Sequence, residues 1–293
     1  MPLGNSKSER TVRALRAAWS TLRGRQLAGR NATIYPDDVV ITSYPRSGNT
    51  WTRFLIGNLI YQDEPTTFAN IEARVPEIYF NPDHVMRRLP RPRILKSHEV
   101  FQPHYKRVIY IVRDPRDVAV SFYHHNLKAG NIADGYPMED FIPRFIAAEF
   151  DYRWGNWAEH VTSWIALREN HPGFLLLRYE DMKKDPEGEL ARVAAFLEQC
   201  SFRKIDSSPQ MLKRAVELSS PERMRELEKA QAKDWVLTKK TRQDKPFVRS
   251  AKAGGWKSTL SPQSVALLES AWGDLMKRMG YELAGVHATA ASE

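Results

Sequence analysis

The chain has 293 residues, of which 42% are hydrophobic and 27% are charged, and its net charge is +9. This length allows one large domain with a full hydrophobic core, and no apolar run approaches the ~18 to 20 residues that a membrane-spanning helix needs. Cys200 is the only cysteine, so no intramolecular disulfide can form, and we expect a cytoplasmic protein. The positive charge suits a nucleic acid, an anionic membrane or a small polyanionic ligand, without choosing among them.

The N-terminal region is basic and carries a helical stripe formed by Val12, Leu15, Trp19 and Leu22. Such a stripe most often packs against a core, and a helix lying on a membrane surface shows the same pattern. Peripheral membrane contact through this segment is therefore one of two interpretations. The expected organisation is a basic helical segment at 1–34, a single domain at 35–285 and a disordered tail at 286–293.

Short apolar runs alternate with helical patterns through the rest of the chain. Runs at 39–42, 93–96, 108–112 and 174–177 are predicted as buried parallel strands. Helices are predicted at 51–59, 154–167 and 186–197. Two more are predicted to begin at Pro115 behind an Asp114 cap and at Pro262 behind a Ser261 cap. In the last helix, the residues expected to face inward are Leu267, Leu268, Trp272 and Leu275. This alternation predicts a single-domain α/β fold, a parallel central sheet flanked by helices in three layers as in P-loop kinases. Residues 233–258 are predicted as a long loop.

An anion-binding turn is predicted directly after the first strand. Residues 44–51 read Tyr-Pro-Arg-Ser-Gly-Asn-Thr-Trp and lead into a helix, whose first N–H groups favour negative charge. Gly48 permits a close backbone approach, while Ser47, Asn49 and Thr50 add polar groups and Arg46 adds a planar fork for phosphate or sulfate. The Walker A spacing is absent, so this is a different phosphate cradle.

The turn resembles the 5′-phosphosulfate loop, P-K-S-G-T-T-W, of the cytosolic-type sulfotransferases, which use 3′-phosphoadenosine 5′-phosphosulfate (PAPS). Residues 107–121 resemble the 3′-phosphate motif of that family. Further similar segments follow in the family's order at 96–98 (Lys-Ser-His), 157–164, 179–182 (Tyr-Glu-Asp-Met) and 249–257. The resemblance runs from about residue 39 to 280 and implies a sulfotransferase without a metal, which converts PAPS to adenosine 3′,5′-bisphosphate.

The resemblance also implies roles for individual residues. The cofactor-binding residues it implies are Arg46, Ser47, Gly48, Asn49, Thr50, Trp51, Arg113, Ser121, Tyr179, Arg249, Ser250 and Ala251. Trp51 and Tyr179 fall on the adenine end, where an aromatic face suits a purine, although Trp51 also begins a helical stripe and could anchor its helix. His98 falls on the family's catalytic base.

The chain departs from the family pattern at several of these positions. Arg46 replaces a lysine and is expected to act as an electrostatic clamp, because a guanidinium does not release a proton. Ser250 and Ala251 replace a lysine and a glycine, so one cation at the 3′-phosphate is missing, with Lys252 or Arg242 as candidate replacements. Pro221 stands where the family places an adenine-flanking phenylalanine. The C-terminal dimer motif of many members has no match, so dimerisation by that route is not expected.

The catalytic residues are predicted to be His98, Lys96 and Arg46. A histidine has an ordinary pKa of ~6.5, which suits removal of a proton from an acceptor near neutral pH. Lys96 lies two residues earlier, on the same side of an extended segment, and is expected to touch the sulfuryl oxygens. Together with Arg46 it would stabilise the charge of the leaving group. No cysteine, histidine or carboxylate set has metal-ligand spacing, so no metal is expected.

Two other functions share parts of this pattern. A P-loop kinase would need a Walker lysine, which is missing, and a magnesium-binding aspartate, which Asp114 could imitate. A basic nucleic-acid or membrane-binding module fits the charge but not the placement of basic residues at strand ends. We therefore expect a small-molecule acceptor (a phenol, alcohol, carbohydrate or glycolipid, by hydroxyl or amine) and no nucleic-acid partner. Candidates for its pocket, or equally for the core, are Phe68, Tyr79, Phe80, Phe101, Tyr105, Tyr136 and Phe141.

Overall fold

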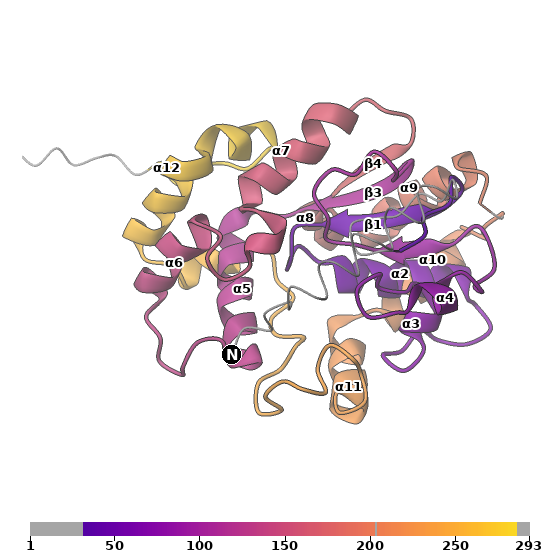
Figure 1. The fold of residues 1–293 in the computed structure, drawn as a ribbon, viewed down its shortest axis with the longest axis horizontal. Coiled ribbons are helices and arrows are strands. Elements are labelled where there is room, and N and C mark those ends of the chain that lie inside the picture. The colour runs from indigo at the N-terminus through magenta and orange to yellow at the C-terminus, as the bar shows by residue number, and fades with distance from the viewer. Residues whose placement is uncertain (1–31, 203, 286–293) are drawn as a thin grey trace, which may run out of the picture.

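The computed structural model describes residues 32–202 and 204–285 (Figure 1). The predictions of a basic helical segment at 1–34 and of a tail at 286–293 fall almost wholly outside these residues. At the centre lies a four-stranded parallel sheet in the order β2-β1-β3-β4. The strands are β1 (Val39–Ser43), β2 (Ile94–Lys96), β3 (Arg107–Val112) and β4 (Phe174–Arg178). All four predicted strands are confirmed, to within one residue at each end.

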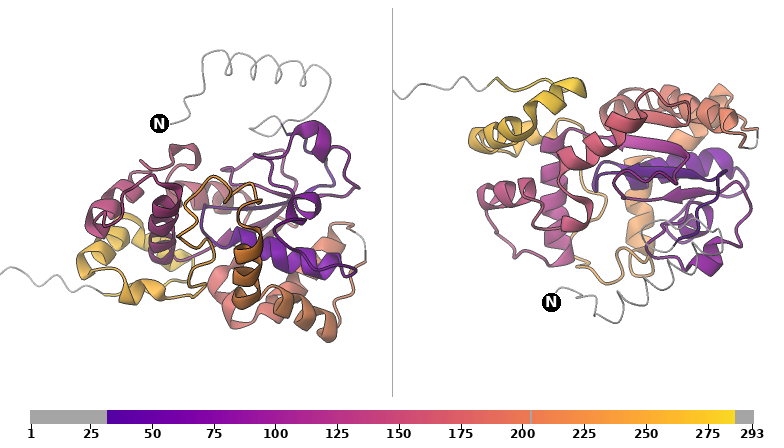
Figure 2. Two further views of the ribbon diagram at one scale, coloured as in Figure 1. Left: turned by 90° about the horizontal axis from the view of Figure 1, so that it is seen from below. Right: turned by 45° about the horizontal axis from the view of Figure 1, so that its top comes forward.

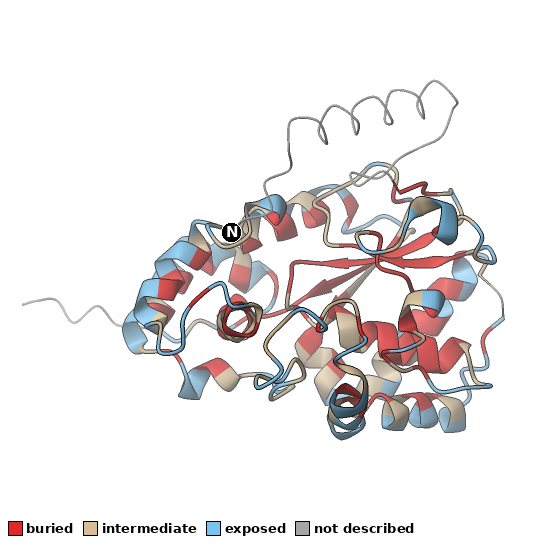
Figure 3. Ribbon diagram, turned by 60° about the horizontal axis from the view of Figure 1, so that its bottom comes forward, coloured by how far each residue is buried: buried red, intermediate tan, exposed pale blue. Residues whose placement is uncertain are grey.

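Helices cover both faces of the sheet, because successive strand residues point to opposite sides. Val39 and Ile41 pack in one apolar cluster with α2 (Asn49–Ile60), α9 (Pro186–Gln199) and α10 (Pro209–Leu218). Val40 packs in another with α5 (Pro115–Ala129), α7 (Trp157–Arg168) and α12 (Pro262–Arg278). Figure 2 shows these helices on either side of the strands, and Figure 3 shows the strands buried between them. The predicted three-layer α/β domain is confirmed.

The predicted helix starts are confirmed where a capping residue gave them. Asp114 accepts a hydrogen bond from the Arg116 backbone N–H at 2.9 Å, and Ser261 accepts one from that of Ser264 at 3.3 Å. The start of the helix predicted at 154–167 was wrong. That helix, α7, begins at Trp157 behind an Asn156 capping box, because residues 152–154 form a separate 3₁₀ turn, η1 (Tyr152–Trp154).

One predicted side-chain orientation was also wrong. Leu267 is 46% exposed, whereas Leu268, Trp272 and Met276 are buried. These three recur every four residues and form the inward line of α12, and Leu267 lies about 100° from it around the helix. Helices that were not predicted are α3 (Ile71–Arg74), α4 (Asp83–Met86), α6 (Met138–Ile146), α8 (Tyr179–Lys184), α10 and α11 (Pro221–Gln231).

The predicted long loop forms a strap, residues 232–254, that ends in a 3₁₀ turn, η2 (Gly255–Ser258). Buried charged side chains fix its backbone. The Lys128 ammonium donates to the carbonyl of Lys245 at 2.6 Å, and the Glu228 carboxylate accepts from the backbone N–H of Val248 at 2.9 Å. Asp117 accepts from the backbone N–H groups of Gly254 at 2.7 Å and Trp256 at 2.9 Å.

The strand order places a ligand crevice at a definite edge. β1 lies between β2 and β3, and the chain leaves β1 toward α2 and leaves β3 toward α5. These two helices lie on opposite faces of the sheet. Where the connections of neighbouring parallel strands run to opposite faces in this way, a crevice is left beyond the carboxyl ends of the strands. The anion-binding turn follows β1, Arg113 follows β3 and His98 follows β2, so all three reach the same edge.

Candidate active site

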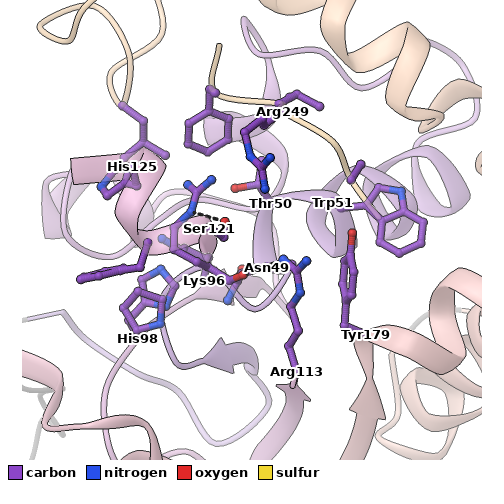
Figure 4. Close-up of a pocket in the computed structure, with 18 of the residues that line it drawn as sticks. Asn49, Thr50, Trp51, Lys96, His98, Arg113, Ser121, His125, Tyr179 and Arg249 are labelled. Atoms are coloured by element: carbon purple, nitrogen blue, oxygen red, sulfur yellow. Dashed lines mark hydrogen bonds between the residues drawn. The ribbon is translucent and has the colours of Figure 1, made fainter. Parts of the chain in front are cut away.

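A cavity of about 450 Å³ lies at this edge, between the loop after β1, α5, α8 and the strap. It is lined by all but one of the predicted site residues: Arg46, Gly48, Asn49, Thr50, Trp51, Lys96, His98, Arg113, Ser121, Tyr179, Arg249, Ser250 and Ala251. The exception is Ser47, which is fully buried away from the cavity. In Figure 4, Trp51 and Tyr179 stand on one side of the cavity and His98 and His125 on the other.

The loop after β1 has the backbone of a tight anion cradle. Gly48 has a φ of 103°, and a Cβ built there would meet Cδ2 of Tyr179 at 2.6 Å, so glycine is needed both for conformation and for space. Arg46 has a φ of 71°, a conformation that non-glycine residues seldom adopt and that is often found at functional sites. Glycine at position 48 therefore lets the Tyr179 ring pack directly against the turn.

The donors available in this loop are mainly backbone groups. No hydrogen bond within the described residues engages the backbone N–H groups of Gly48, Asn49 and Thr50, the first groups of α2. The Asn49 side-chain amide is already used, because it donates to the Ser43 hydroxyl at 3.2 Å and the Ser97 carbonyl at 3.3 Å. Asn49 thus ties the loop to β1 and the end of β2, and the free N–H groups at the positive end of the helix remain for an anion.

Three arginines converge on the middle of the cavity. The Arg113 guanidinium donates to the carbonyls of Arg46 at 3.2 Å and Lys252 at 3.0 Å and lies 4.2 Å from the Tyr179 ring centre. Arg46 Nε donates to the Ser121 hydroxyl at 3.2 Å, the contact dashed in Figure 4. Burial, Arg113 and Arg249 together lower the pKa of Arg46 to about 10. This crowding of like charges favours binding of a polyanion.

Neither of the two candidate replacements for the cation missing at Ser250 lines the cavity. Arg242 pairs with Asp134 at 2.8 Å and with Asp244 at 2.6 Å, and neither it nor Lys252 lines the cavity. Its aspartate partners hold the Arg242 side chain away from the site. Pro221, which stands at the position of the family's phenylalanine, lines the cavity, as do Met224 and Leu237, which share an apolar cluster with Trp51.

Among the described residues, one ring nitrogen of His98 has a hydrogen-bond partner and the other has none. Its Nδ1 lies 2.7 Å from the Ser43 carbonyl, and a carbonyl can only accept, so Nδ1 carries the hydrogen and the lone pair is on Nε2. The backbone N–H of His98 donates to the Tyr79 hydroxyl at 2.8 Å, and its carbonyl lies 3.1 Å from His160 Nε2. Burial and the nearby Lys96 ammonium lower the pKa of His98 well below its usual value, so the ring is neutral near pH 7.

Lys96 lines the cavity as expected, but it has a partner that the sequence did not reveal. Its ammonium lies 2.6 Å from Oε1 of Glu77, and both side chains are almost completely buried. A second residue missed is His125, whose Nδ1 is buried and has no hydrogen-bond partner among the described residues. Burial and the Arg46 charge lower its pKa to about 3. His124-His125 gave no distinctive pattern in the sequence, and Glu77 is close to Lys96 only through tertiary structure.

Of the aromatic residues expected to line either an acceptor pocket or the core, two line the cavity. These are Tyr79 and Phe80. Phe68, Tyr105 and Phe141 are buried in the apolar clusters, Phe101 packs against one of them, and the Tyr136 hydroxyl accepts from Arg144. Further aromatic lining comes from Phe122, Phe150 and Trp154, and the Trp154 ring centre lies 5.9 Å from that of His98.

Within residues 32–202 and 204–285, no group of three or more histidine, cysteine or carboxylate side chains is arranged to hold a metal ion. In the same part of the chain, no helix is both long and apolar enough to cross a membrane.

Comparisons with known proteins identify the family. The family model for the sulfotransferase domain matches residues 36–280. Sulfotransferase 1B1 of Mus musculus is 32% identical over 241 residues, covering 76% of this chain and 77% of the relative. Sulfotransferase 1A1 of Bos taurus is 36% identical over 179 residues, covering 56% of this chain and 59% of the relative.

Solved structures show the same fold. Retinol dehydratase in complex with androsterone and the inactive cofactor PAP superposes with a TM-score of 0.66 at 23% identity, covering 85% of this chain and 88% of the other. Mouse sulfotransferase SULT7A1 complexed with PAP gives a TM-score of 0.66 at 24% identity, covering 84% and 86%. The chain therefore belongs to the sulfotransferase family. It is a PAPS-dependent sulfotransferase.

Proposed function

We propose that this enzyme transfers the sulfuryl group of PAPS to a small-molecule hydroxyl (or amine) by in-line attack, with His98 as the general base. The observation that carries the proposal is the cavity itself. One continuous space joins the free N–H groups after Gly48 and the arginine cluster to the unprotonated Nε2 of His98. An anionic donor at the first and an acceptor beside the second would be aligned for transfer.

The donor would extend across the cavity between two anion sites. The 5′-phosphosulfate would contact the N–H groups of Gly48 to Thr50 and the Arg46 guanidinium, and the 3′-phosphate would contact Arg113, Ser121 and the strap at 249–251. Support comes from Arg113, whose buried Nε has no hydrogen-bond partner among the described residues. Trp51 and Tyr179, whose ring centres lie 5.7 Å apart in an edge-to-face arrangement, would flank the adenine.

The proton balance follows from the tautomer of His98. As the acceptor oxygen forms its bond to sulfur, its proton passes to His98 Nε2, and the bond between sulfur and the 5′-phosphate oxygen breaks. The released charge would be stabilised by Arg46, Lys96 and the loop N–H groups, and adenosine 3′,5′-bisphosphate leaves. Burial makes free His98 a weak base, and the charge of a bound donor would raise its pKa toward the working range.

We propose an acceptor alcohol or phenol with an apolar body. Tyr79, Phe122, Phe150 and Trp154 line the same cavity as His98 and offer aromatic surface to a flat or apolar molecule. Androsterone and retinol are bound in two of the similar structures, and both are apolar alcohols. A cytoplasmic location stays a prediction from cysteine usage.

The test is transfer from labelled PAPS to a panel of phenols, sterols, sugars and amines, with wild type, His98→Gln and His104→Gln. His104 does not line the cavity and serves as the matched control. We expect His98→Gln to lose roughly 10²- to 10⁴-fold in kcat while it still binds adenosine 3′,5′-bisphosphate, and His104→Gln to match wild type. Activity of His98→Gln within a few-fold of wild type would contradict the assignment of the base.

A further inference from the structure

Four side chains of alternating charge, three of them buried, form a chain beside the cavity. Glu72 Oε1 lies 2.8 Å from Arg53 Nη2, Arg53 Nη1 lies 4.0 Å from Glu77 Oε2, and Glu77 Oε1 lies 2.6 Å from Lys96 Nζ. The side chains of Arg53, Glu77 and Lys96 are at most 4% exposed. Only the last two line the cavity, so the chain of charges ends at the site of transfer.

The backbone fixes Glu77 beside Lys96. The two residues form an isolated parallel bridge, in which the Lys96 N–H donates to the Pro76 carbonyl at 2.8 Å and the Ile78 N–H donates to the Lys96 carbonyl at 3.1 Å. The Glu77 backbone N–H donates in turn to Glu72 Oε2 at 2.9 Å. The short ion pair therefore joins two rigid segments, and its geometry does not depend on a mobile loop.

The surroundings of Lys96 would otherwise oppose its charge. Burial lowers the pKa of Lys96, and the Arg53 guanidinium lowers it further, while Glu77 and, more weakly, Glu72 raise it. The neutral groups nearby are the Tyr79 ring, whose centre lies 6.0 Å from Nζ, and the imidazoles of His98 and His125, whose pKa values the Lys96 charge lowers. Glu77 is thus the main group that favours the ammonium form, and a buried lysine left against an arginine readily loses its proton.

We propose that Glu77 is the positioning residue for Lys96: its carboxylate holds the ammonium at the floor of the cavity and keeps it charged for contact with the sulfuryl oxygens. This rests on the proposed function of the site. Glu77 Oε2 has no hydrogen-bond partner within the described residues and faces Arg53 Nη1. When Lys96 leans toward the donor, the carboxylate can therefore close on Arg53 and stay neutralised.

The experiment compares kcat as a function of pH for wild type, Glu77→Gln, Glu77→Asp and Glu72→Gln. Glu72→Gln is the matched control, since Glu72 also pairs with Arg53 and makes no direct contact with Lys96. We expect Glu77→Gln to move the alkaline limb of the profile to lower pH by about one to three units, the usual effect of removing an adjacent opposite charge. Glu77→Asp, with its carboxylate withdrawn by one methylene, should move it less in the same direction, and Glu72→Gln should move it least, because Glu72 favours the charge of Lys96 only weakly.

Binding of adenosine 3′,5′-bisphosphate separates this inference from the proposed function. This product lacks the sulfuryl group, so its Kd should stay within about twofold of wild type in Glu77→Gln, a change of less than about 0.5 kcal/mol. Failure of the wild type to bind it would sink the proposed function instead. An alkaline limb in Glu77→Gln that coincides with wild type would overturn the role of Glu77. Should that variant fail to fold, as judged by circular dichroism, an unshifted limb in Glu77→Asp would do so.

Discussion

The Asp117 carboxylate fastens the C-terminal end of the strap that lines the cavity, next to the hydrogen bond that Arg113 donates to the Lys252 carbonyl at 3.0 Å. The Asp117 side chain is 3% exposed and accepts from two backbone N–H groups, those of Gly254 at 2.7 Å and Trp256 at 2.9 Å. Trp256 is itself buried in the apolar cluster, and Arg116 lies 3.9 Å from its ring centre. Loss of the carboxylate should therefore lower the free energy of unfolding of the whole domain and loosen the attachment of the strap.

The replacement Asp117→Asn keeps the shape and removes the charge. Its one amide oxygen can accept from one of the two N–H groups, and its NH₂ group then faces the other, which becomes a buried donor without an acceptor. A hydrogen bond to a charged group contributes about 1.5–3 kcal/mol, so one lost bond and one weakened bond predict a loss of about 3 kcal/mol in the free energy of unfolding.

Urea unfolding followed by tryptophan fluorescence measures this loss. The control is Asp181→Asn, because the Asp181 side chain is 47% exposed and its ion pair with Arg178 spans 3.7 Å, so it should change stability by less than about 0.5 kcal/mol. An Asp117→Asn variant as stable as the Asp181→Asn control would refute the assignment of Asp117 as the fastening of the strap.

Three further outcomes are expected. Gly48→Ala should weaken binding of adenosine 3′,5′-bisphosphate more than roughly tenfold in a calorimetric titration, because its Cβ would stand 2.6 Å from Tyr179 Cδ2 at a φ of 103°; unchanged affinity would mean that the cradle is not the phosphate site. Burial lowers the pKa of His160 to about 4, so the unfolded state takes up the proton first, and the free energy of unfolding should fall as pH drops from ~6.5 toward 4. Urea titrations at several pH values should show this slope, and a flat profile would speak against a buried neutral imidazole. Leu268→Ala should lower the free energy of unfolding by about 2–5 kcal/mol in the same assay, and Leu267→Ala should lower it by less than about 0.5 kcal/mol. The reason is that the two residues are 0% and 46% exposed. Equal losses would contradict the orientation of α12.

The elements that could be predicted from the sequence are those that a local sequence pattern marks. The four strands are continuous apolar runs, and the starts of α5 and α12 carry a capping residue followed by proline. The same signal, Ser-Pro, precedes α10 and α11 and could have identified both. The short helices α3 and α4, of four residues each, have no amphipathic stripe to detect.

The sequence predicted which residues meet at the candidate site, and it did not predict the contacts among them. Parallel strands bring the residues that follow them to one edge, so Arg46, His98 and Arg113 could be expected together. The partner of Lys96 could not be expected, because Glu77 lies nineteen positions earlier, outside the predicted strands, and reaches Lys96 through an isolated bridge. The hydrogen bonds that the Asn49 side-chain amide donates to Ser43 and Ser97 could not be expected either, because they depend on tertiary packing.

Isothermal titration with adenosine 3′,5′-bisphosphate, against ADP, on wild type and Arg113→Ala tests the donor site most directly. The account predicts tight binding by wild type that requires the 3′-phosphate, and a loss of roughly 30-fold or more in Arg113→Ala, since removal of one partner from a buried charge pair costs about 2–5 kcal/mol. Equal affinity for ADP, or an Arg113→Ala variant that binds as tightly as wild type, would contradict the placement of the donor between the loop after β1 and Arg113.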